Sequence, residues 1–179
     1  MTRIVAGEWK GHSLPNLTRG TVRPTTDRAR TILFDTLRNV QDLTVLDLYS
    51  GTGALGFEAL SRGAKSLVSI DSDRDYIQLQ KKWILNHEKP FEALVGDVKN
   101  VLGFLKGKYD LILADPPYDM DLSKDEINLI EEHAAHNSTF VYERQRKSDS
   151  IIDSKYFTLE KEKLVSDTRI QFYKAKNYE

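Results

Sequence analysis

Four consecutive residues, Asp115-Pro116-Pro117-Tyr118, combine groups that could activate an amino nitrogen. They directly follow the apolar run Tyr109–Ala114. Proline cannot continue a strand ladder and it fixes φ, so the run should end in a rigid turn. If the Asp115 carboxylate and the Pro116 carbonyl each accept one N–H, the lone pair of a planar amino group is oriented and the positive charge developing on nitrogen is dispersed. Pro117 and Tyr118 would contact the planar substrate, Tyr118 by stacking.

A second candidate is a glycine loop, Gly51-Thr52-Gly53-Ala54-Leu55-Gly56, which follows the apolar run Val45–Tyr49. Together with Asp71 it matches the dinucleotide-binding fingerprint, so an NAD-dependent oxidoreductase or another nucleotide-binding module is one interpretation. Asp47 favours a different ligand, because a carboxylate before the loop would repel a pyrophosphate and attract an ammonium. S-adenosylmethionine carries such an ammonium and no phosphate. The sequence therefore predicts S-adenosylmethionine as the cofactor.

The predicted cofactor site uses residues that follow successive strands. The glycines allow close backbone approach, Asp71 accepts the two ribose hydroxyls, and Asp97 with the Val98 N–H contacts an adenine edge. The alternative role for Asp97 is the N-cap of a helix over Val98–Leu105, and the two roles can coexist. No metal is expected, because a sulfonium is already a good leaving group. The predicted cofactor-binding residues are Asp47, Ser50, Gly51, Gly53, Asp71, Ser72, Asp97, Val98 and Asp115.

The elements that must position these residues alternate short apolar runs with longer helical patterns. This alternation predicts an α/β fold with a mostly parallel sheet covered on both faces and with the site beyond the carboxyl ends of the strands. Tyr156–Leu164 and Thr168–Lys174, separated by Val165-Ser166-Asp167, predict a C-terminal antiparallel hairpin. The five runs that predict parallel strands are Val45–Tyr49, Leu67–Asp71, Ala93–Val95, Leu111–Ala114 and Thr139–Glu143.

The N-terminal part differs in pattern from the rest. Arg3–Leu14 alternates apolar and polar residues, which predicts a small β-hairpin outside the main fold. Thr25-Thr26-Asp27 precedes apolar residues at helical spacing and predicts a capped amphipathic helix. We therefore divide the chain into an N-terminal hairpin extension over residues 1–22 and a methyltransferase domain over residues 23–179.

Composition limits the class of protein. A chain of 179 residues with 40% hydrophobic and 30% charged residues fits one water-soluble domain, and no apolar run is long enough to span a membrane. The absence of cysteine excludes disulfides and thiolate chemistry. The N-terminus lacks a secretory pattern, so we expect a cytoplasmic protein, and nothing in the apolar pattern requires a second copy, so we expect a monomer.

Charge is distributed unevenly along the chain. Residues 1–40 contain seven Lys and Arg against three Asp and Glu, an excess of +4, whereas the remainder carries −5. The basic N-terminal part is therefore the better candidate for an anionic partner, although a solvated basic flank would have the same composition.

The chain resembles the RsmD family, bacterial methyltransferases that modify the N2 amino group of a guanine in 16S ribosomal RNA. The most specific motif is Arg23-Pro24-Thr25-Thr26-Asp27-Arg28, and the similarity extends from Arg3 to the terminal hairpin. Further matching segments are Arg3-Ile4-Val5-Ala6-Gly7, Lys10-Gly11, Leu33-Phe34, Ser50–Gly56, Glu58–Gly63 and Phe172-Tyr173.

The resemblance implies a seven-stranded class I methyltransferase fold of the Rossmann-like type, with a small N-terminal hairpin for RNA. It also implies a substrate presented on the small ribosomal subunit or its assembly intermediate. Two departures, Ala6 and the turn Val165-Ser166-Asp167, affect loops and not the proposed chemistry. The predicted substrate-binding residues are Lys10, Arg23, Thr25, Arg28, Arg30, Pro117, Tyr118 and Arg144.

Two related activities use the same four-residue segment. A methyltransferase that modifies adenine in nucleic acid, or a glutamine side chain in a protein, could also orient its target nitrogen with Asp115 and Pro116. DNA is the weaker alternative, because the chain has little room for a DNA target-recognition domain.

Overall fold

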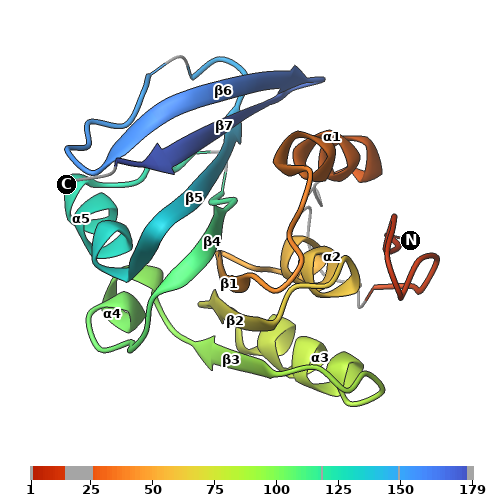
Figure 1. The fold of residues 1–179 in the computed structure, drawn as a ribbon. Coiled ribbons are helices and arrows are strands. Elements are labelled where there is room, and N and C mark those ends of the chain that lie inside the picture. Colours follow the sequence, from red (N-terminus) through yellow and green to blue (C-terminus); the bar gives the residue numbers. More distant parts are fainter. Residues whose placement is uncertain (1, 15–25, 118, 149, 177–179) are drawn as a thin grey trace.

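A computed structural model describes residues 2–14, 26–117, 119–148 and 150–176 (Figure 1). Seven strands form one sheet in the order β3-β2-β1-β4-β5-β7-β6. Neighbouring strands from β3 to β5 are parallel, and β7 pairs antiparallel with both β5 and β6. The predicted mostly parallel sheet with a C-terminal antiparallel hairpin is confirmed. The strands are β1 Thr44–Leu48, β2 Ser66–Asp71, β3 Phe91–Val95, β4 Tyr109–Ala114, β5 Ala134–Gln145, β6 Phe157–Val165 and β7 Thr168–Ala175.

The strand order reverses beside β1. The chain continues from β1 to β2 and β3 on one side, and then returns to place β4 and β5 on the other side. In open parallel sheets, ligands bind at the carboxyl ends of the strands next to such a reversal. The structure therefore places the expected site at the carboxyl ends of β1, β2 and β4.

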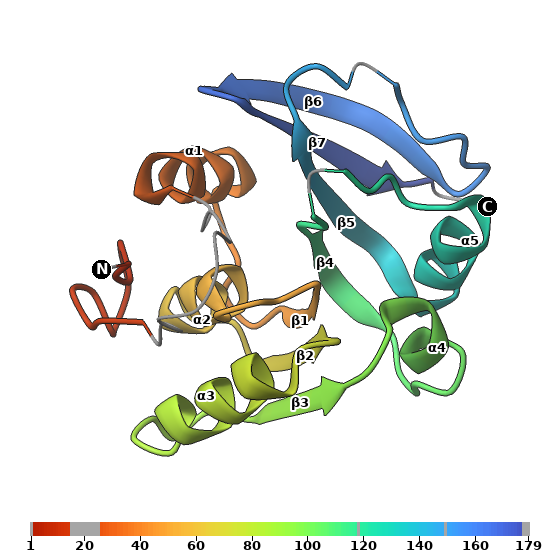
Figure 2. The same ribbon diagram turned by 180° about the vertical axis from the view of Figure 1, so that it is seen from behind.

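Five helices cover the two faces of the sheet in the described residues. α1, α2 and α3 lie on one side and α4 and α5 on the other (Figures 1 and 2). The helices are α1 Asp27–Leu37, α2 Ala54–Ser61, α3 Arg74–Ile84, α4 Val98–Leu102 and α5 Lys124–His133. None of them is long and apolar enough to cross a membrane.

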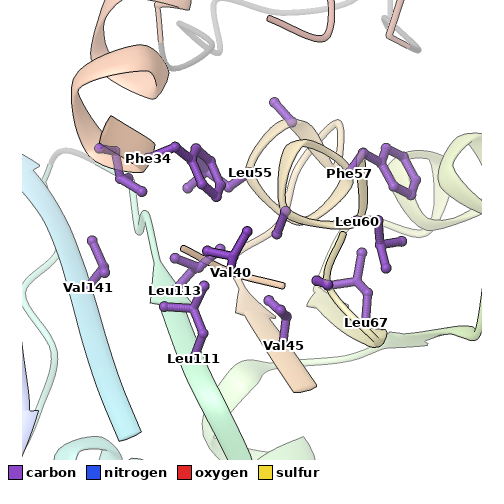
Figure 3. Packing of buried hydrophobic residues seen from close by; sticks show 14 of the residues in the cluster. Phe34, Val40, Val45, Leu55, Phe57, Leu60, Leu67, Leu111, Leu113 and Val141 are labelled. Atoms are coloured by element: carbon purple, nitrogen blue, oxygen red, sulfur yellow. The ribbon is translucent and has the colours of Figure 1, made fainter. Parts of the chain in front are cut away.

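Alternating strand residues separate two hydrophobic cores. Val45 and Leu111 face α1 and α2, whereas Leu46 and Ile112 face α4 and α5. Figure 3 shows the first core. The side chains labelled there are Phe34, Val40, Val45, Leu55, Phe57, Leu60, Leu67, Leu111, Leu113 and Val141.

Side-chain caps fix where the described helices α1, α3, α4 and α5 begin. The Thr26 hydroxyl accepts the Ala29 N–H at 3.1 Å, as the sequence predicts for α1. The Asp97 carboxylate accepts the Asn100 N–H at 3.0 Å and so caps α4, which ends at Leu102 and not at the predicted Leu105. Ser123 and Glu126 form a reciprocal capping box at α5.

The N-terminal segment, residues 2–14, is packed onto the domain. An antiparallel bridge joins Arg3 and Ser13, consistent with the predicted hairpin. Ile4, Trp9 and Leu14 are buried in the core that contains α1 and α2, so the expectation of a hairpin outside the main fold is wrong. The segment lies against α2, on the side away from β4 (Figures 1 and 2). The predicted boundary between residues 22 and 23 lies outside the described residues.

Candidate active site

The register of the sheet brings the predicted site segments to one edge. Leu48 at the end of β1 pairs with Ile70 of β2 and with Ala114 of β4. The Asp115 N–H donates to the Leu48 carbonyl at 3.4 Å. The glycine loop, Asp71 and Asp115 therefore begin at neighbouring strand ends, although they are far apart in sequence.

The glycine loop is held by Asp71. One carboxylate oxygen, Oδ2, accepts the Gly51 N–H at 2.7 Å, and the other, Oδ1, accepts the Asp73 N–H at 2.8 Å. Burial raises the pKa of Asp71, and these two backbone donors partly offset that effect. Gly53 has a φ of 80°, and a Cβ there would lie 2.7 Å from the Phe57 ring. The loop therefore needs glycine at this position both for its backbone conformation and for its close packing.

Gln80 of α3 holds the glycine loop through two hydrogen bonds, a role that the sequence analysis missed. Its buried amide Nε2 donates to the Ser50 hydroxyl at 2.9 Å and to the Gly51 carbonyl at 2.7 Å. The available signal was its spacing, because Gln80 lies three residues after Ile77 and four before Ile84 on the buried face of α3. A polar residue on such a face must find a buried partner.

Tyr49 is a second residue whose role the sequence did not indicate. It has a φ of 58°, which is uncommon for a residue with a side chain, at the point where β1 turns into the glycine loop. Its hydroxyl donates to Glu126 of α5. Burial, followed by this hydrogen bond, raises the pKa of Tyr49, so the phenol stays neutral and continues to donate. The Tyr49–Glu126 contact thereby anchors the turn to the helix opposite the glycine loop.

Asp47 lies inside the protein and does not face the open side of the loop. Its side chain is 1% exposed, and Oδ2 accepts the Gly56 N–H at 3.0 Å near the start of α2. A carboxylate buried in this way has no surface left for a bound ammonium. The predicted contact between Asp47 and the ammonium of the cofactor is therefore wrong, and Asp47 instead stabilises the start of α2. Asp47 still disfavours a dinucleotide, because it occupies an N–H at the helix end that a pyrophosphate would otherwise use.

Three of the predicted cofactor-binding residues follow β2 and β3, and two of them, Asp97 and Val98, were predicted to contact adenine. Asp97 is exposed and is the N-cap of α4, which is the alternative role that its sequence predicted. The Val98 side chain is buried in the core, which leaves its backbone as the group available to a ligand. Ser72 is exposed directly after β2. These positions are compatible with the predicted roles, which remain predictions.

The predicted catalytic segment starts where β4 ends. Asp115 is partly exposed, Pro116 is buried and Pro117 is exposed. The Pro117 carbonyl accepts the Met120 N–H at 2.9 Å, so a turn closes directly after the prolines. No described residue donates a hydrogen bond to the Pro116 carbonyl. Tyr118 lies outside the described residues.

The predicted substrate-binding cations divide into two groups. Lys10 and Arg28 are exposed and can meet an anionic partner. Arg30 is fully buried, where one guanidinium nitrogen donates to the Arg3 carbonyl at 2.6 Å and to Asp27 at 2.6 Å. Its predicted contact with RNA is therefore wrong: Arg30 joins α1 to the N-terminal segment. Arg23 and Thr25 lie outside the described residues.

The predicted contact of Arg144 with RNA is also wrong. Its side chain is 4% exposed and forms an ion pair with Asp121. The same guanidinium donates to the Ser150 carbonyl at 2.8 Å. A buried cation with these partners cannot serve as a surface contact for RNA phosphates, although it lines a cavity beside the prolines of the catalytic segment.

The residues present fit S-adenosylmethionine. A Cβ built on Gly51 would meet nothing within 4 Å, so one side of the loop is open to a ligand. Acidic side chains follow β2 and β3 and can accept hydroxyl and amino donors. The cofactor would be held by the Ser50–Gly53 loop, by Asp71 with Ser72, and by Asp97 with the Val98 N–H. No group of three or more His, Asp or Glu side chains suited to a metal ion occurs among the described residues.

The fold and this site together define a class I methyltransferase that depends on S-adenosylmethionine. The family model described as "Conserved hypothetical protein 95" matches residues 2–174. The chain belongs to this family, the RsmD family.

Individual relatives agree with this assignment. A ribosomal RNA small subunit methyltransferase D from Haemophilus influenzae is 32% identical, with 96% of this chain and 92% of the relative covered. The protein of the same name from Escherichia coli K12 is 37% identical over 73% of this chain and 67% of its own length. The solved structure of "Putative methyltransferase yhhF" from Escherichia coli has a TM-score of 0.86 at 29% identity and covers 97% of both chains.

Proposed function

We propose that this protein transfers a methyl group from S-adenosylmethionine to the N2 amino group of a guanine in 16S ribosomal RNA. The observation that carries the proposal is the position of Asp115-Pro116-Pro117, which begins at the end of β4 next to β1 and its glycine loop. The family relatives that are named small subunit methyltransferases support the choice of RNA.

The catalytic segment acts by orientation. When bound, S-adenosylmethionine supplies an activated methyl group. The Asp115 carboxylate and the Pro116 carbonyl each accept one N–H of the amino group, which directs its lone pair and stabilises the positive charge that develops on nitrogen. The buried Pro116 and the turn closed by Met120 hold these two acceptors in place. Pro117 and Tyr118 contact the flat face of the base in this proposal.

A large RNA substrate fits the distribution of the exposed cations. Helices that follow parallel strands return to the amino edge of the sheet, so Ser61 at the end of α2 lies away from Asp115. The Glu8 N–H donates to the Ser61 carbonyl at 2.8 Å, which places the segment bearing Lys10 near that edge. Arg28 lies in the first turn of α1. A single nucleotide would be too small to contact Asp115, Arg28 and Lys10 together.

We propose the small subunit or its assembly intermediate as the partner, met by a monomer in the cytoplasm. A guanine that is stacked in RNA structure must first be turned outward, at a cost of a few kcal/mol. Contacts made by Lys10 and Arg28 away from the catalytic segment would offset that cost.

The test is methylation of small-subunit particles from cells that lack this modification. With labelled S-adenosylmethionine, we expect N2-methylguanine at one position, located by mass mapping of the ribosomal RNA. Asp115→Ala should lower the rate by at least about 100-fold, because it removes one of two acceptors used in the transition state. Its affinity for S-adenosylmethionine should stay within a few-fold of the unaltered protein. Asp153→Ala, which changes an exposed carboxylate, is the control.

Other products would point to other functions. Absence of N2-methylguanine from the particles would contradict the proposal. Labelled N6-methyladenine in naked DNA, or methylglutamine in protein, would support the related activities. Tight NAD binding without binding of S-adenosylmethionine would indicate that the protein is a nucleotide-binding module.

A further inference from the structure

A cavity of about 280 Å³ lies directly beside the catalytic prolines. Pro116 and Pro117 form one side, and the other side comes from the loop after them and from the end of β5. The residues whose polar side chains line this second side include Asp121, Arg144 and Gln145. Asp115 directly precedes Pro116 in the chain, so a base that presents an amino group to the Pro116 carbonyl can extend into this cavity.

Arg144 fixes one side chain of the cavity, that of Asp121. Its guanidinium forms an ion pair with Asp121 Oδ1, donates to the Ser150 carbonyl at 2.8 Å, and lies 5.0 Å above the Tyr142 ring. The Tyr142 hydroxyl is 3.5 Å from the same Asp121 oxygen. A buried arginine with three neighbours has little freedom, so Asp121 is held in one orientation.

The second oxygen of Asp121 is left for a ligand. Both contacts of this carboxylate use Oδ1, and no described residue forms a hydrogen bond with Oδ2. The Asp121 side chain is 68% exposed although its partner Arg144 is buried. The cavity therefore presents a fixed hydrogen-bond acceptor close to the catalytic segment.

The chemistry of the bases makes such an acceptor selective. In guanine, the N2 amino group is adjacent to N1–H, which is a donor. In adenine, the ring nitrogen beside the amino group is an acceptor, which a carboxylate would repel. A carboxylate next to the methylated amino group therefore favours guanine both by attraction and by rejection of adenine.

We propose that Asp121 selects guanine by accepting its N1–H, and that Arg144 is the positioning residue that holds Asp121 for this contact. The inference rests on the proposed function of the Asp115 segment and adds the determinant of base choice. It also gives the cavity an occupant, one flipped guanine.

The experiment compares two bases at the methylated position. Small-subunit particles are assembled with guanine or with 2-aminopurine, which keeps the N2 amino group but lacks N1–H and O6. We expect the unaltered protein to prefer guanine in kcat/KM, and Asp121→Ala to lower that preference by roughly 10–100-fold, the range of a charge-assisted hydrogen bond. Arg144→Lys, which keeps the charge but loses the planar fork, should lower the preference by a smaller factor.

The matched control is Asp125→Ala. Asp125 is also an exposed carboxylate in an ion pair, with a 69% exposed side chain 2.7 Å from Lys99, but it does not line the cavity. Its variant should retain the unaltered preference for guanine. Binding of S-adenosylmethionine by each variant verifies that the protein is folded.

Two failures are distinguishable. If Asp121→Ala keeps the full preference for guanine while the unaltered protein makes N2-methylguanine, the role of Asp121 is wrong and the proposed function stands. If the unaltered protein makes no N2-methylguanine on the guanine particle, the proposed function itself fails, and the inference fails with it.

Discussion

At the scale of single residues, Asp47 shows how burial changes the role of an acid. It lies under the glycine loop with the Gly56 N–H as its hydrogen-bond donor. Burial raises the pKa of Asp47 to about 8, and the nearby carboxylates of Asp115 and Asp71 add to the rise that the Gly56 donor opposes. The folded protein therefore favours the neutral form of Asp47 over most of the physiological range.

This shift predicts how stability depends on pH. Between about pH 4 and pH 8 the folded protein keeps a proton that the unfolded chain releases, so stability contributed by this group falls as pH rises and levels off above pH 8. In Asp47→Asn this contribution disappears. We expect the free energy of unfolding of the unaltered protein, measured with urea, to decline relative to the variant by up to ~1.4 kcal/mol per pH unit. Equal pH slopes would contradict the prediction.

At the scale of elements, α2 joins the glycine loop to the N-terminal segment. Glu58 is buried and accepts the Val5 N–H at 2.8 Å and the Ala6 N–H at 3.0 Å. Ser61 accepts the Trp9 N–H at 3.0 Å. Because these donors are backbone groups, α2 holds the segment in a fixed path whatever its side chains contact outside.

Two glycines of the segment provide a matched test of this attachment. Gly7 and Gly11 have nearly the same φ, 86° and 85°, but a Cβ on Gly7 would lie 2.0 Å from the Ser61 carbonyl oxygen, whereas one on Gly11 would meet nothing within 4 Å. Both alanine variants carry a backbone strain of roughly 1–3 kcal/mol. Only Gly7→Ala should also separate the segment from α2.

Amide hydrogen exchange measures the difference. In Gly7→Ala we expect the Val5, Ala6 and Trp9 amides to lose most of their protection, while the strands of the sheet stay protected. In Gly11→Ala these three amides should remain protected. Similar exchange in the two variants would mean that the contact with Ser61 does not hold the segment.

At the scale of the whole molecule, exposed cations occur far from the catalytic segment. Arg28 and Arg38 lie at opposite ends of α1. Arg38 borders a groove together with Thr139, Glu160 and Lys174, so a carboxylate lies among these cations. The RNA surface that we propose includes Lys10 and Arg28 and excludes Arg38.

Salt dependence tests that surface. Each phosphate contact releases counterions, so Lys10→Ala and Arg28→Ala should weaken binding to small-subunit particles and lower the slope of log affinity against log salt by about 1 each. Arg38→Ala should change neither quantity, and all three variants should bind S-adenosylmethionine normally. If Lys10→Ala and Arg28→Ala bind the particles with the same affinity and salt slope as Arg38→Ala, the RNA contacts another surface.

The sequence alone was enough to predict the fold and the position of Asp115-Pro116-Pro117 directly after a strand. Strand ends, glycines and the prolines after Ala114 are local signals, because backbone conformation and hydrophobic periodicity act over a few residues. The terminal hairpin and a capped helix after Thr25-Thr26-Asp27 were predicted for the same reason, and the structure identifies Thr26 as the cap. Asp115 and the glycine loop could be assigned to one edge because parallel strands end together.

Only the tertiary structure decided which polar groups are buried and what they contact. Arg28 and Arg30 have the same charge and are two residues apart, yet one is exposed and the other is buried against the N-terminal segment. The partners of Asp47 and Arg144 likewise come from packing between elements. Burial depends on residues distant in sequence, and desolvation then determines whether a charged side chain is free to bind RNA or must serve the fold.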